Sequence, residues 1–419
     1  MTQERQRIAI IGSGISGLGV AYMLKTHQEN NVYEKNAYLG GHSRTIEVND
    51  DGKQVPVDTG FIVFNDWNYP NLTALFRILD VPHEKSDMSF GVSIKSGWLE
   101  YASGSIFSFR NLLRPQYWGM LKDIVKFNTQ AEKYLDRDPS FTLGDVMDDL
   151  NMGQWFRDYY LKAMGAAIWS CSATTILDFP ARTYIRFFKN HGLINFIKRP
   201  QWYTVTGGSR EYVKRLTTGF VDKIKLNCGA QKVVRADGRI TVQDTLGQSE
   251  EFDHVIFACH ADEAIALLDN PSADEKAIIG DFSYQPNSII VHQDESFMPR
   301  DRKSWASWVY LSEEDTDSKD VVSLTYWMNN LQNMETSKPL LVTLNPGRRP
   351  QEDLILDEHD FTHPIFNEAA IRAQGKVDDL QGQNNTWFCG AYQRYGFHED
   401  GLLSAVKLVR KMGVSIPWN

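Results

Sequence analysis

The sequence predicts an α/β fold in which a parallel sheet is assembled from separate stretches of the chain, with an interleaved second domain of mixed sheet and helical cap. A β-branched run at residues 8–11 leads into a glycine-rich turn and an Ala- and Leu-rich segment, which is the order of strand, turn and helix. Residues 105–200 are rich in aromatic residues and interrupted by prolines, which favours short packed helices. Strand patterns return after this region, so we expect the first sheet to resume there.

Composition and charge limit the class of protein. A chain of 419 residues that is 42% hydrophobic and 23% charged can bury a sizeable core, which excludes a largely disordered or fibrous protein. The 44 Lys and Arg against 53 Asp and Glu leave a net charge of -9, which argues against nucleic acid as a partner because phosphate binding needs a positive surface.

Targeting and metal signals are weak. Residues 8–24 imitate the core of a signal peptide, but glycines interrupt the run and no small-residue cleavage site follows promptly, so we expect a cytoplasmic protein without a spanning helix. His359 and His363 are four residues apart, but Pro364 follows at once and disfavours a helix that would carry both as metal ligands, so no metal is predicted. The cysteines are widely spaced and are expected to be reduced packing residues; they are Cys171, Cys228, Cys259 and Cys389.

The remaining elements follow from local patterns. The first helix is predicted to end near Lys25 and to lead into a short strand at residues 31–35. Residues 288–342 carry β-branched and aromatic strands of a second sheet, the acidic run 312–320 reads as a solvated hairpin loop, and residues 401–412 form the last helix. The strands that return to the first domain are predicted at residues 223–227, 232–236, 239–244 and 254–259, with a tight turn at Asp237-Gly238.

The glycine-rich turn has the spacing of a dinucleotide-binding motif. Gly12 permits a tight turn, Gly14 lets the backbone approach a pyrophosphate, and Gly17 lets helix and strand pack closely. The start of the helix offers free N–H groups to the phosphates. Glu34 ends the next strand, where an acidic residue accepts hydrogen bonds from the ribose and disfavours a 2′-phosphate. The motif therefore predicts NAD or FAD rather than NADP.

Two further segments favour FAD over NAD. Residues 38–45 form a second glycine-rich approach, and residues 57–64 form an apolar strand suited to line a flat ring. Near the other end, residues 387–391 read as a strand that ends in glycine, and residues 398–401 open the last helix. A nicotinamide enzyme does not need this pair at the end of the chain.

Taken in order, these motifs resemble the FAD-dependent amine oxidase superfamily, which also contains polyamine and monoamine oxidases, protoporphyrinogen oxidase and phytoene-type desaturases. The resemblance implies a Rossmann-like FAD-binding domain of the flavin amine oxidase fold, with Gly60 and Phe61 beside the flavin ring and the Val233 main chain at the adenine. It also implies noncovalent FAD, held by Gly12, Gly14, Ile15, Ser16, Gly17, Glu34, Lys35, Gly40, Gly41, His42, Ser43, Arg44, Gly60, Phe61, Val233, Gly390, Gly401 and Leu402.

The sequence departs from the family pattern at three places. Asn36 and His42 stand where the family usually has arginine, with Arg44 as the nearest cation, and Ala391 stands where an acid is usual. FAD would then be held more by backbone donors than by charge. The implied domain order is an FAD-binding part at 1–100, a helical cap at 101–210, FAD-binding return strands at 211–285, a substrate-domain sheet at 286–380 and an FAD-binding end at 381–419.

Two cap segments mix cations with apolar residues. Residues 179–210 contain six Lys and Arg and no acid, interleaved with aromatic residues that include Phe187, Phe188, Phe196, Ile197, Trp202 and Tyr203. Residues 105–127 repeat this pattern around Trp118. One interpretation is a surface that contacts an anionic membrane at its inner face. The other is a pair of amphipathic helices with their apolar faces in the core.

A cationic rim around an apolar tunnel would favour a fatty acyl chain over a protonated amine. The sequence is similar to a bacterial branch of NAD/FAD-binding proteins often encoded beside cyclopropane-fatty-acid-synthase-like lipid methyltransferases, through residues 323–332, 363–374 and 395–405. We therefore expect an FAD-dependent oxidoreductase that oxidises or desaturates an apolar substrate, such as a membrane-lipid fatty acyl chain, by hydride transfer to flavin N5. An amine or amino-acid oxidase, and a non-catalytic flavoprotein partner of a lipid methyltransferase, are the alternatives. The candidates near the reacting carbon are Tyr326, Trp327, Tyr392, Tyr395 and His398, with core packing as the other interpretation of the aromatic residues and helix capping as that of residues 398–400.

Overall fold

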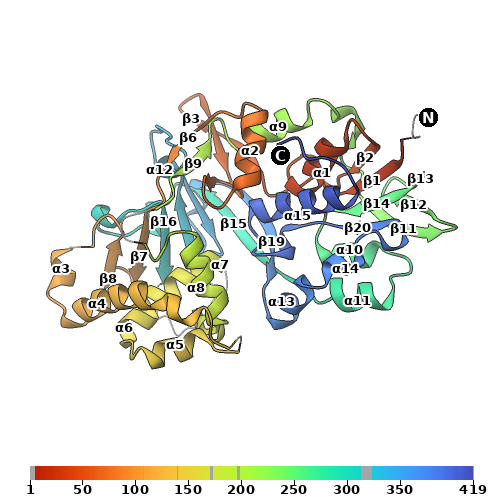
Figure 1. Ribbon diagram of the computed structural model, residues 1–419. Coiled ribbons are helices and arrows are strands. Elements are labelled where there is room, and N and C mark those ends of the chain that lie inside the picture. Colours follow the sequence, from red (N-terminus) through yellow and green to blue (C-terminus); the bar gives the residue numbers. More distant parts are fainter. Residues whose placement is uncertain are drawn as a thin grey trace.

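The computed structural model describes residues 5–106, 108–138, 140–169, 173–195, 199–312 and 323–418 (Figure 1). Several sequence predictions concern residues outside these ranges: Cys171, Lys198 with its neighbours Phe196 and Ile197, and residues 313–320 of the acidic run.

A five-stranded parallel sheet forms the first layer, in the order β10-β2-β1-β14-β20. Alternate residues of β1 face opposite sides of the sheet. Ile8 and Ile10 pack in the core under α1 and α15, whereas Ala9 and Ile11 pack in the core on the opposite face. A sheet covered on both faces explains the nearly continuous apolar run of β1. The strands are β1 Arg7–Ile11, β2 Glu29–Tyr33, β10 Ile224–Lys225, β14 His254–Phe257 and β20 Thr386–Phe388.

The helices on the two faces come from distant parts of the chain. The first face carries α1 Ile15–Leu24, α2 Pro70–Ile78, α9 Arg210–Thr217 and α15 His398–Lys411. The second carries α10 Ala261–Leu267, α11 Ala273–Ile279, α13 Glu368–Gln374 and α14 Val377–Leu380, with the antiparallel strands β11 Ala230–Ala236, β12 Arg239–Asp244 and β13 Ser249–Phe252. The Asp237-Gly238 turn joins β11 and β12 as predicted, with positive φ at both residues. The last helix begins at His398, three residues before the predicted start.

A seven-stranded mixed sheet forms the second layer (Figure 1). Its parallel pair β7–β16 joins residues 90–94 to residues 308–312, so residues 90–100 lie in this sheet and not in the first domain to which the predicted boundary assigned them. Conversely, α13 and α14 pack on the parallel sheet, although residues 286–380 were expected to form the second sheet. In order, the strands are β19 Ile355–Ile365, β15 Ser283–His292, β18 Leu341–Leu344, β17 Ser323–Trp327, β16 Trp308–Ser312, β7 Phe90–Ile94 and β8 Leu99–Ala102.

A helical cap covers one end of this sheet, as the aromatic and proline pattern predicts. Its core is built from large buried side chains such as Tyr117, Phe127 and Phe188. A π-helical turn at Arg157–Lys162 separates two of the helices, which are α3 Phe109–Leu112, α4 Pro115–Gln130, α5 Leu143–Asp149, α6 Gln154–Phe156, α7 Ala163–Trp169 and α8 Ala181–Asn190.

Short strands connect the layers. The predicted strand at residues 57–64 is interrupted: β4 ends at Asp58 and β5 begins at Val63, because the backbone turns at Gly60. The remaining elements are the hairpin β3 Thr45–Asp50 and β4 Lys53–Asp58, the sheet of β5 Val63–Asn65, β9 Trp202–Val205 and β6 His83–Ser86, and the helix α12 Met328–Leu331.

Candidate active site

The turn between β1 and α1 is open where a ligand would approach. Gly12 has a φ of 103°, and a Cβ atom on Gly17 would stand 2.0 Å from the Gly12 carbonyl oxygen, so neither position tolerates a side chain. A Cβ atom on Gly14 would meet no atom within 4 Å. Gly14 precedes α1 without a side-chain cap, so the first N–H groups of the helix are left for another acceptor.

The second glycine loop packs directly on this turn. The N–H of Gly40 donates to the Ser13 carbonyl at 3.0 Å, and Gly14 and Gly40 form a parallel bridge. Gly41 has a positive φ, and a Cβ atom there would lie 3.2 Å from the Cα of Gly14. The two loops therefore need glycine for their contact with each other, and together they form one wall of the site.

Glu34 lies at the end of β2, beside the same turn. Its buried carboxylate accepts from the Ser13 hydroxyl at 2.6 Å, from the Ser13 N–H at 3.0 Å and from the Asn36 N–H at 2.8 Å. The next residue, Lys35, which was also predicted as a cofactor contact, forms an ion pair with Glu263. The position of Glu34 suits a ribose, and the carboxylate is already held in place.

Val233, whose main chain was expected at the adenine, already has a main-chain partner in the structure. Its side chain is fully buried in the core on the second face of the parallel sheet. Its carbonyl accepts from the N–H of Asp269 at 3.0 Å. The returning segment reaches β2 earlier, where the N–H of Cys228 donates to the Glu34 carbonyl at 2.8 Å and a Cβ atom on Gly229 would lie 2.9 Å from that of Lys35. The glycine beside Cys228 is the sequence signal that marks this approach.

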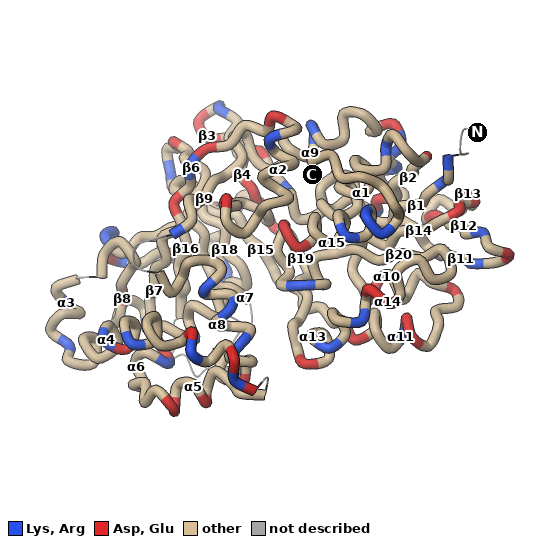
Figure 2. Tube along the Cα trace, viewed as in Figure 1, with Lys and Arg blue, Asp and Glu red and all other residues tan. Residues whose placement is uncertain are grey.

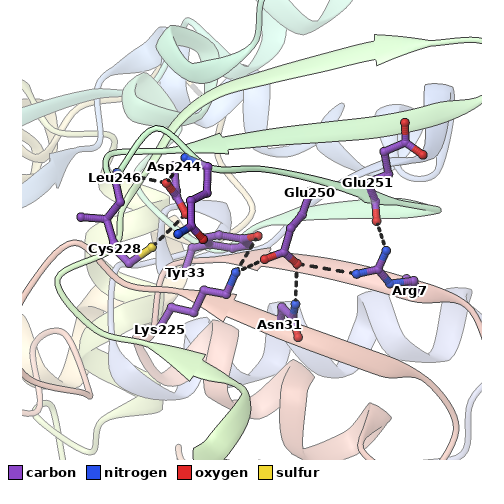
Figure 3. Close-up of polar contacts among 10 residues, drawn as sticks. Arg7, Asn31, Tyr33, Lys225, Cys228, Asp244, Leu246, Glu250 and Glu251 are labelled. Carbon is purple, nitrogen blue, oxygen red and sulfur yellow. Dashed lines mark hydrogen bonds and ion pairs between the residues drawn. The ribbon is translucent and has the colours of Figure 1, made fainter.

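Polar contacts hold that segment against β2 (Figure 3). Glu250 accepts from Asn31 at 3.0 Å and forms an ion pair with Lys225, while the Cys228 thiol donates to Asp244 at 3.2 Å. These contacts join β2, β10 and the three-stranded sheet, and they fix the edge of the site next to Glu34.

His42 is a half-buried residue whose buried Nε2 atom is unsatisfied. Its carbonyl accepts from the Phe61 N–H at 2.8 Å, and a Cβ atom on Gly60 would stand 2.2 Å from that carbonyl oxygen. The ring stacks on Phe361 with a centroid distance of 4.4 Å. Its Nε2 atom has no hydrogen-bond partner within the described part of the chain. Burial, together with the nearby histidines, lowers the pKa of His42 well below its ordinary value, so the ring is neutral.

Two further histidines line the same region, His363 from β19 of the second sheet and His260 from the segment between β14 and α10. His363 lies with its ring centroid 5.3 Å from that of His42, and the His260 ring stacks on Tyr284 at 4.2 Å. Burial lowers the pKa of His363 to about 4 and also lowers that of His260. These neutral rings give the region hydrogen-bonding atoms without adding charge.

His398, the first residue of α15, belongs to a buried hydrogen-bond chain. Its Nε2 atom lies 2.7 Å from the Tyr212 hydroxyl, which lies 2.5 Å from the Ser43 hydroxyl. The imidazole stacks on Phe61 with a centroid distance of 3.9 Å and an interplanar angle of 12°. Burial lowers the pKa of His398 to about 3. The chain thus links α15, α9 and the second glycine loop around a neutral imidazole.

We expect Tyr212→Phe to lower the free energy of unfolding by about 1–3 kcal/mol, because the Ser43 hydroxyl and the His398 Nε2 atom lose their short hydrogen bonds to Tyr212 and keep only their own 3.5 Å contact. Denaturant unfolding measures this. Tyr117→Phe is the matched control, since that buried hydroxyl donates to a main-chain carbonyl, that of Ile106. A Tyr212→Phe loss no larger than that of the control would contradict the chain.

The start of α15 is occupied by packing and capping. A Cβ atom on Gly401 would lie 2.9 Å from both Ile15 Cγ2 and Ser16 Oγ, and the Leu402 side chain lies on Gly19. Gly401, Leu402, Ile15 and Ser16 therefore bring the N-terminus of α15 beside that of α1. The N–H of Gly390, predicted as a cofactor contact, donates to the Ser404 hydroxyl at 2.8 Å.

The acidic residues after His398 are capping residues, as one of the two sequence interpretations expects. Glu399 accepts from the N–H groups of Asn71 and Leu72 and so caps α2, while Asp400 accepts from the N–H groups of Tyr395 and Phe397 before its own helix. Burial raises the pKa of both carboxyl groups.

Comparison with known proteins agrees with this geometry. The family model described as an NAD(P)-binding Rossmann-like domain matches residues 10–79. No curated protein matches the sequence. Among solved structures, a CLA-producing fatty acid isomerase from P. acnes is 14% identical with a TM-score of 0.68 over 99% of this chain and 100% of that one. Cyclohexylamine oxidase from Brevibacterium oxydans is 14% identical with a TM-score of 0.70, over 98% and 100% of the two chains. Reduced UDP-galactopyranose mutase is 15% identical with a TM-score of 0.67, over 99% and 97%.

The chain has the flavin amine oxidase fold. The predicted fold class is thereby confirmed. The three similar structures carry names of different reactions, so this fold alone does not identify the substrate.

The flavin amine oxidase fold places the five catalytic candidates in different surroundings. Tyr326 and Trp327 are adjacent on β17 and face opposite sides of the sheet: Tyr326 packs with Trp308 on the side of Phe361, whereas Trp327 packs with Trp305 on the other. Trp327 is therefore excluded from the site that contains His42. Burial raises the pKa of Tyr326, which keeps its hydroxyl protonated.

Tyr392 and Tyr395 also separate. Tyr392 is buried against Phe282 in the cluster beneath the parallel sheet, so it is a core residue and not a group at the reacting carbon. Tyr395 is partly exposed, and its ring lies edge-on to Phe187 of the cap. Of the five candidates, His398 and Tyr326 are the two that the described structure places around the Phe61 and Phe361 rings.

Arg44 is not a free cation. Its guanidinium forms a two-pronged ion pair with Asp357 of β19, at 2.7 and 3.1 Å. This pair ties the second glycine loop to the second sheet. The positive charge of Arg44 is therefore already paired with a carboxylate of the protein.

Sequence reasoning missed the residues that reach the site from distant elements. Tyr212, His260 and Phe361 carry no motif of their own, and His363 was considered only as half of a metal pair and as the start of the segment 363–374. The fold brings Phe361 and His363 of β19 beside His42. Within the described residues, no helix is long and apolar enough to cross a membrane, and no group of three or more His, Cys, Asp or Glu side chains is placed to hold a metal. The described cysteines Cys228, Cys259 and Cys389 are free thiols.

Proposed function

We propose that the chain is an FAD-dependent oxidoreductase that removes hydrogen from an apolar substrate such as a membrane-lipid acyl chain. The observation that carries the proposal is the meeting of two helix N-termini, those of α1 and α15, at glycine-lined turns beside the buried and unsatisfied Nε2 atom of His42. A dinucleotide with a flat aromatic end fits such a site, because the open turn accepts phosphates and the unsatisfied imidazole needs a polar partner.

Different residues would contact different parts of the cofactor. The N–H groups at the start of α1 would hold the pyrophosphate, Glu34 the ribose and His42 the edge of the flavin ring. When bound, FAD supplies an acceptor for a hydride from a substrate C–H bond. The protein contributes orientation through the Phe61–His398 stack and excludes water through the surrounding aromatic rings. We expect the binding to be noncovalent.

The side of the second sheet that carries Tyr326 supports an apolar substrate. Its cluster contains side chains from the connecting strands, the cap and the sheet, including Ile62, Val63, Ala167, Phe90, Trp308 and Tyr326. Burial of each methylene group of an alkyl chain in such surroundings contributes about 0.8 kcal/mol. The fatty acid substrate in the name of one similar structure is in keeping with this proposal.

A protonated amine would need a buried carboxylate as partner. Asp58 is buried nearby, but its oxygens already accept from Ser209 Oγ at 2.8 Å, from Thr45 Oγ1 at 2.6 Å and from Gln332 Nε2 at 3.1 Å. The carboxylate holds β4, α9 and α12 together. This satisfied environment favours the acyl substrate over the amine.

The test is anaerobic bleaching of the flavin absorbance in protein reconstituted with FAD. We expect bleaching by phospholipid with methyl-branched acyl chains, with loss of two hydrogens in the lipid by mass spectrometry, and none by cyclohexylamine or putrescine. Tyr326→Ala should slow the reaction, whereas Trp327→Phe on the opposite face should not. Bleaching by amines with release of peroxide would favour an amine oxidase. A flavoprotein that bleaches with none of these and co-purifies with a lipid methyltransferase would favour the non-catalytic role.

A further inference from the structure

An exposed apolar patch lies at the end of the helical cap. We name it the cap tip and define it by four side chains: Trp98 is 38% exposed, Phe109 76%, Leu113 69% and Trp118 50%. Phe109 belongs to α3, Leu113 follows it, and Trp118 lies in the first turns of α4. In Figure 1, α3 lies at the end of the molecule farthest from the parallel sheet.

Exposed large hydrophobic residues of the described chain are gathered at this patch. Five of the twelve, the cap tip and Val125, fall between residues 98 and 125. Exposed large residues elsewhere, such as Leu246 on the turn between β12 and β13 and Leu356 on β19, are dispersed over the other elements. Scattered exposure is ordinary in folded proteins, whereas a gathered patch indicates a binding surface.

The structure separates the two basic segments of the cap. On α8, Phe187 and Phe188 are buried in the cap core, so the apolar face of residues 181–190 is already covered by protein. The cation Lys189 forms an ion pair with Glu132. The prediction of a membrane-facing surface is therefore not supported for this helix, and the interpretation of an amphipathic helix packed on the core holds for it.

The cap tip differs because its apolar side chains point outward together with cations. Arg110, Arg114 and Lys122 lie in the same stretch, and residues 101–122 contain no Asp or Glu in a chain whose net charge is -9. The Arg114 guanidinium lies 4.6 Å from the centroid of the Trp98 ring. Figure 2 shows Lys and Arg on α3 and α4 at this end of the molecule.

We propose that the cap tip inserts into the headgroup region of an anionic lipid bilayer. Tryptophan rings favour the interface between water and hydrocarbon, phenylalanine and leucine reach below it, and arginine and lysine pair with anionic headgroups. Attachment through this end puts the cap on the membrane and leaves the dinucleotide-binding layer on the opposite side in water. The proposal concerns binding alone and holds for any substrate of the site.

Flotation with vesicles tests it. The full chain should float with vesicles of equal parts phosphatidylglycerol and phosphatidylcholine, and much less with pure phosphatidylcholine or at high salt. The double variant Phe109→Ser and Leu113→Ser should lose at least about tenfold in vesicle affinity, because two apolar side chains no longer enter the bilayer. Arg110→Glu with Lys122→Glu should abolish the preference for phosphatidylglycerol.

Matched variants guard against nonspecific effects. Leu246→Ser removes an equally exposed leucine and Lys407→Glu reverses an exposed cation on α15, and both should bind vesicles like the unchanged chain. Equal binding by the double variant, or equal loss with Leu246→Ser, would overturn the proposal. The proposal would also be overturned if the chain does not float with anionic vesicles and the double variant is monomeric where the unchanged chain is dimeric. The cap tip would then be a contact between two copies of the protein.

Discussion

The variant Gly14→Val is expected to fold normally and to lose its affinity for FAD by about a hundredfold, which corresponds to about 2.7 kcal/mol. The backbone at Gly14 has φ -68° and ψ 179°, an extended conformation that valine adopts readily, and a Cβ atom there meets no atom of the protein. The added side chain would instead occupy the space in front of the α1 N–H groups. The substitution is therefore expected to weaken the binding of FAD and to leave the stability of the fold unchanged.

Flavin absorbance and fluorescence after reconstitution give the affinity, and thermal unfolding of the unloaded chain checks the fold. Gly347→Val is the matched control, because that exposed glycine also has open space at its Cβ position. Gly17→Ala should behave in the opposite way and destabilise the chain itself, since its Cβ atom would overlap the Gly12 carbonyl. If Gly14→Val binds FAD as tightly as the unchanged chain, the pyrophosphate does not lie at this turn.

The second large effect is acid destabilisation. Burial lowers the pKa of His398 to about 3 and those of His191, His292 and His363 to about 4, whereas these side chains titrate near their ordinary pKa of about 6.5 when the chain unfolds. Below that pH the unfolded chain binds more protons than the folded one, so stability falls as the pH falls. Each such histidine contributes a loss of about 1.4 kcal/mol per pH unit until the pH reaches its folded pKa.

Three carboxyl groups oppose this trend in part. Burial raises the pKa of Asp58 to about 6, so the folded chain takes up a proton there as the pH falls below about 6. Burial also raises the pKa of Glu399 and of Asp400, so the folded chain takes up protons at these sites before the unfolded chain does. The histidines outnumber them, because His42 is also held neutral. We therefore expect a net loss of several kcal/mol and unfolding near pH 5, since folded proteins have only about 5–15 kcal/mol of stability.

Calorimetry in buffers of different ionisation enthalpy measures the protons taken up on unfolding, and near pH 5.5 we expect net uptake. His191→Leu should reduce the pH slope, whereas His27→Asn, on an exposed residue, should leave it unchanged. A melting temperature that is constant from pH 7.5 to pH 5 would show that these histidines are protonated in the folded chain.

Local patterns predicted the elements with their own periodicity or turn chemistry. The strand at residues 7–11, the helix that ends before Lys25 and the Asp237-Gly238 hairpin lie where the sequence places them, because each depends on neighbouring residues. The boundaries between domains were predicted less well. The pairing of β7 with β16 joins residues 90–94 to residues 308–312, and no local pattern encodes such a contact.

Some residues of the candidate site were likewise predictable from local sequence, and others were not. Glycines at residues 12, 17, 40 and 41 are recognisable in sequence because backbone geometry and close approach exclude other residues there, whereas Gly14 is recognisable by its place in the motif and has open space at its Cβ position. Tyr392 and Trp327 were misplaced, since the side of a strand that faces a ligand depends on what packs against it. The chain His398–Tyr212–Ser43 and the stack of His42 on Phe361 join residues from distant elements.

Local sequence was enough to predict that a glycine-lined turn with the spacing of a dinucleotide-binding motif opens the first helix, and that the two ends of the chain build one parallel sheet. The packing of distant elements was needed to show which aromatic and imidazole side chains surround the buried Nε2 atom of His42, and which apolar side chains of the cap remain in water. The physical reason is that glycine and turn requirements are local, whereas burial, and with it the protonation of histidines and the exposure of apolar residues, depends on every element that packs around them.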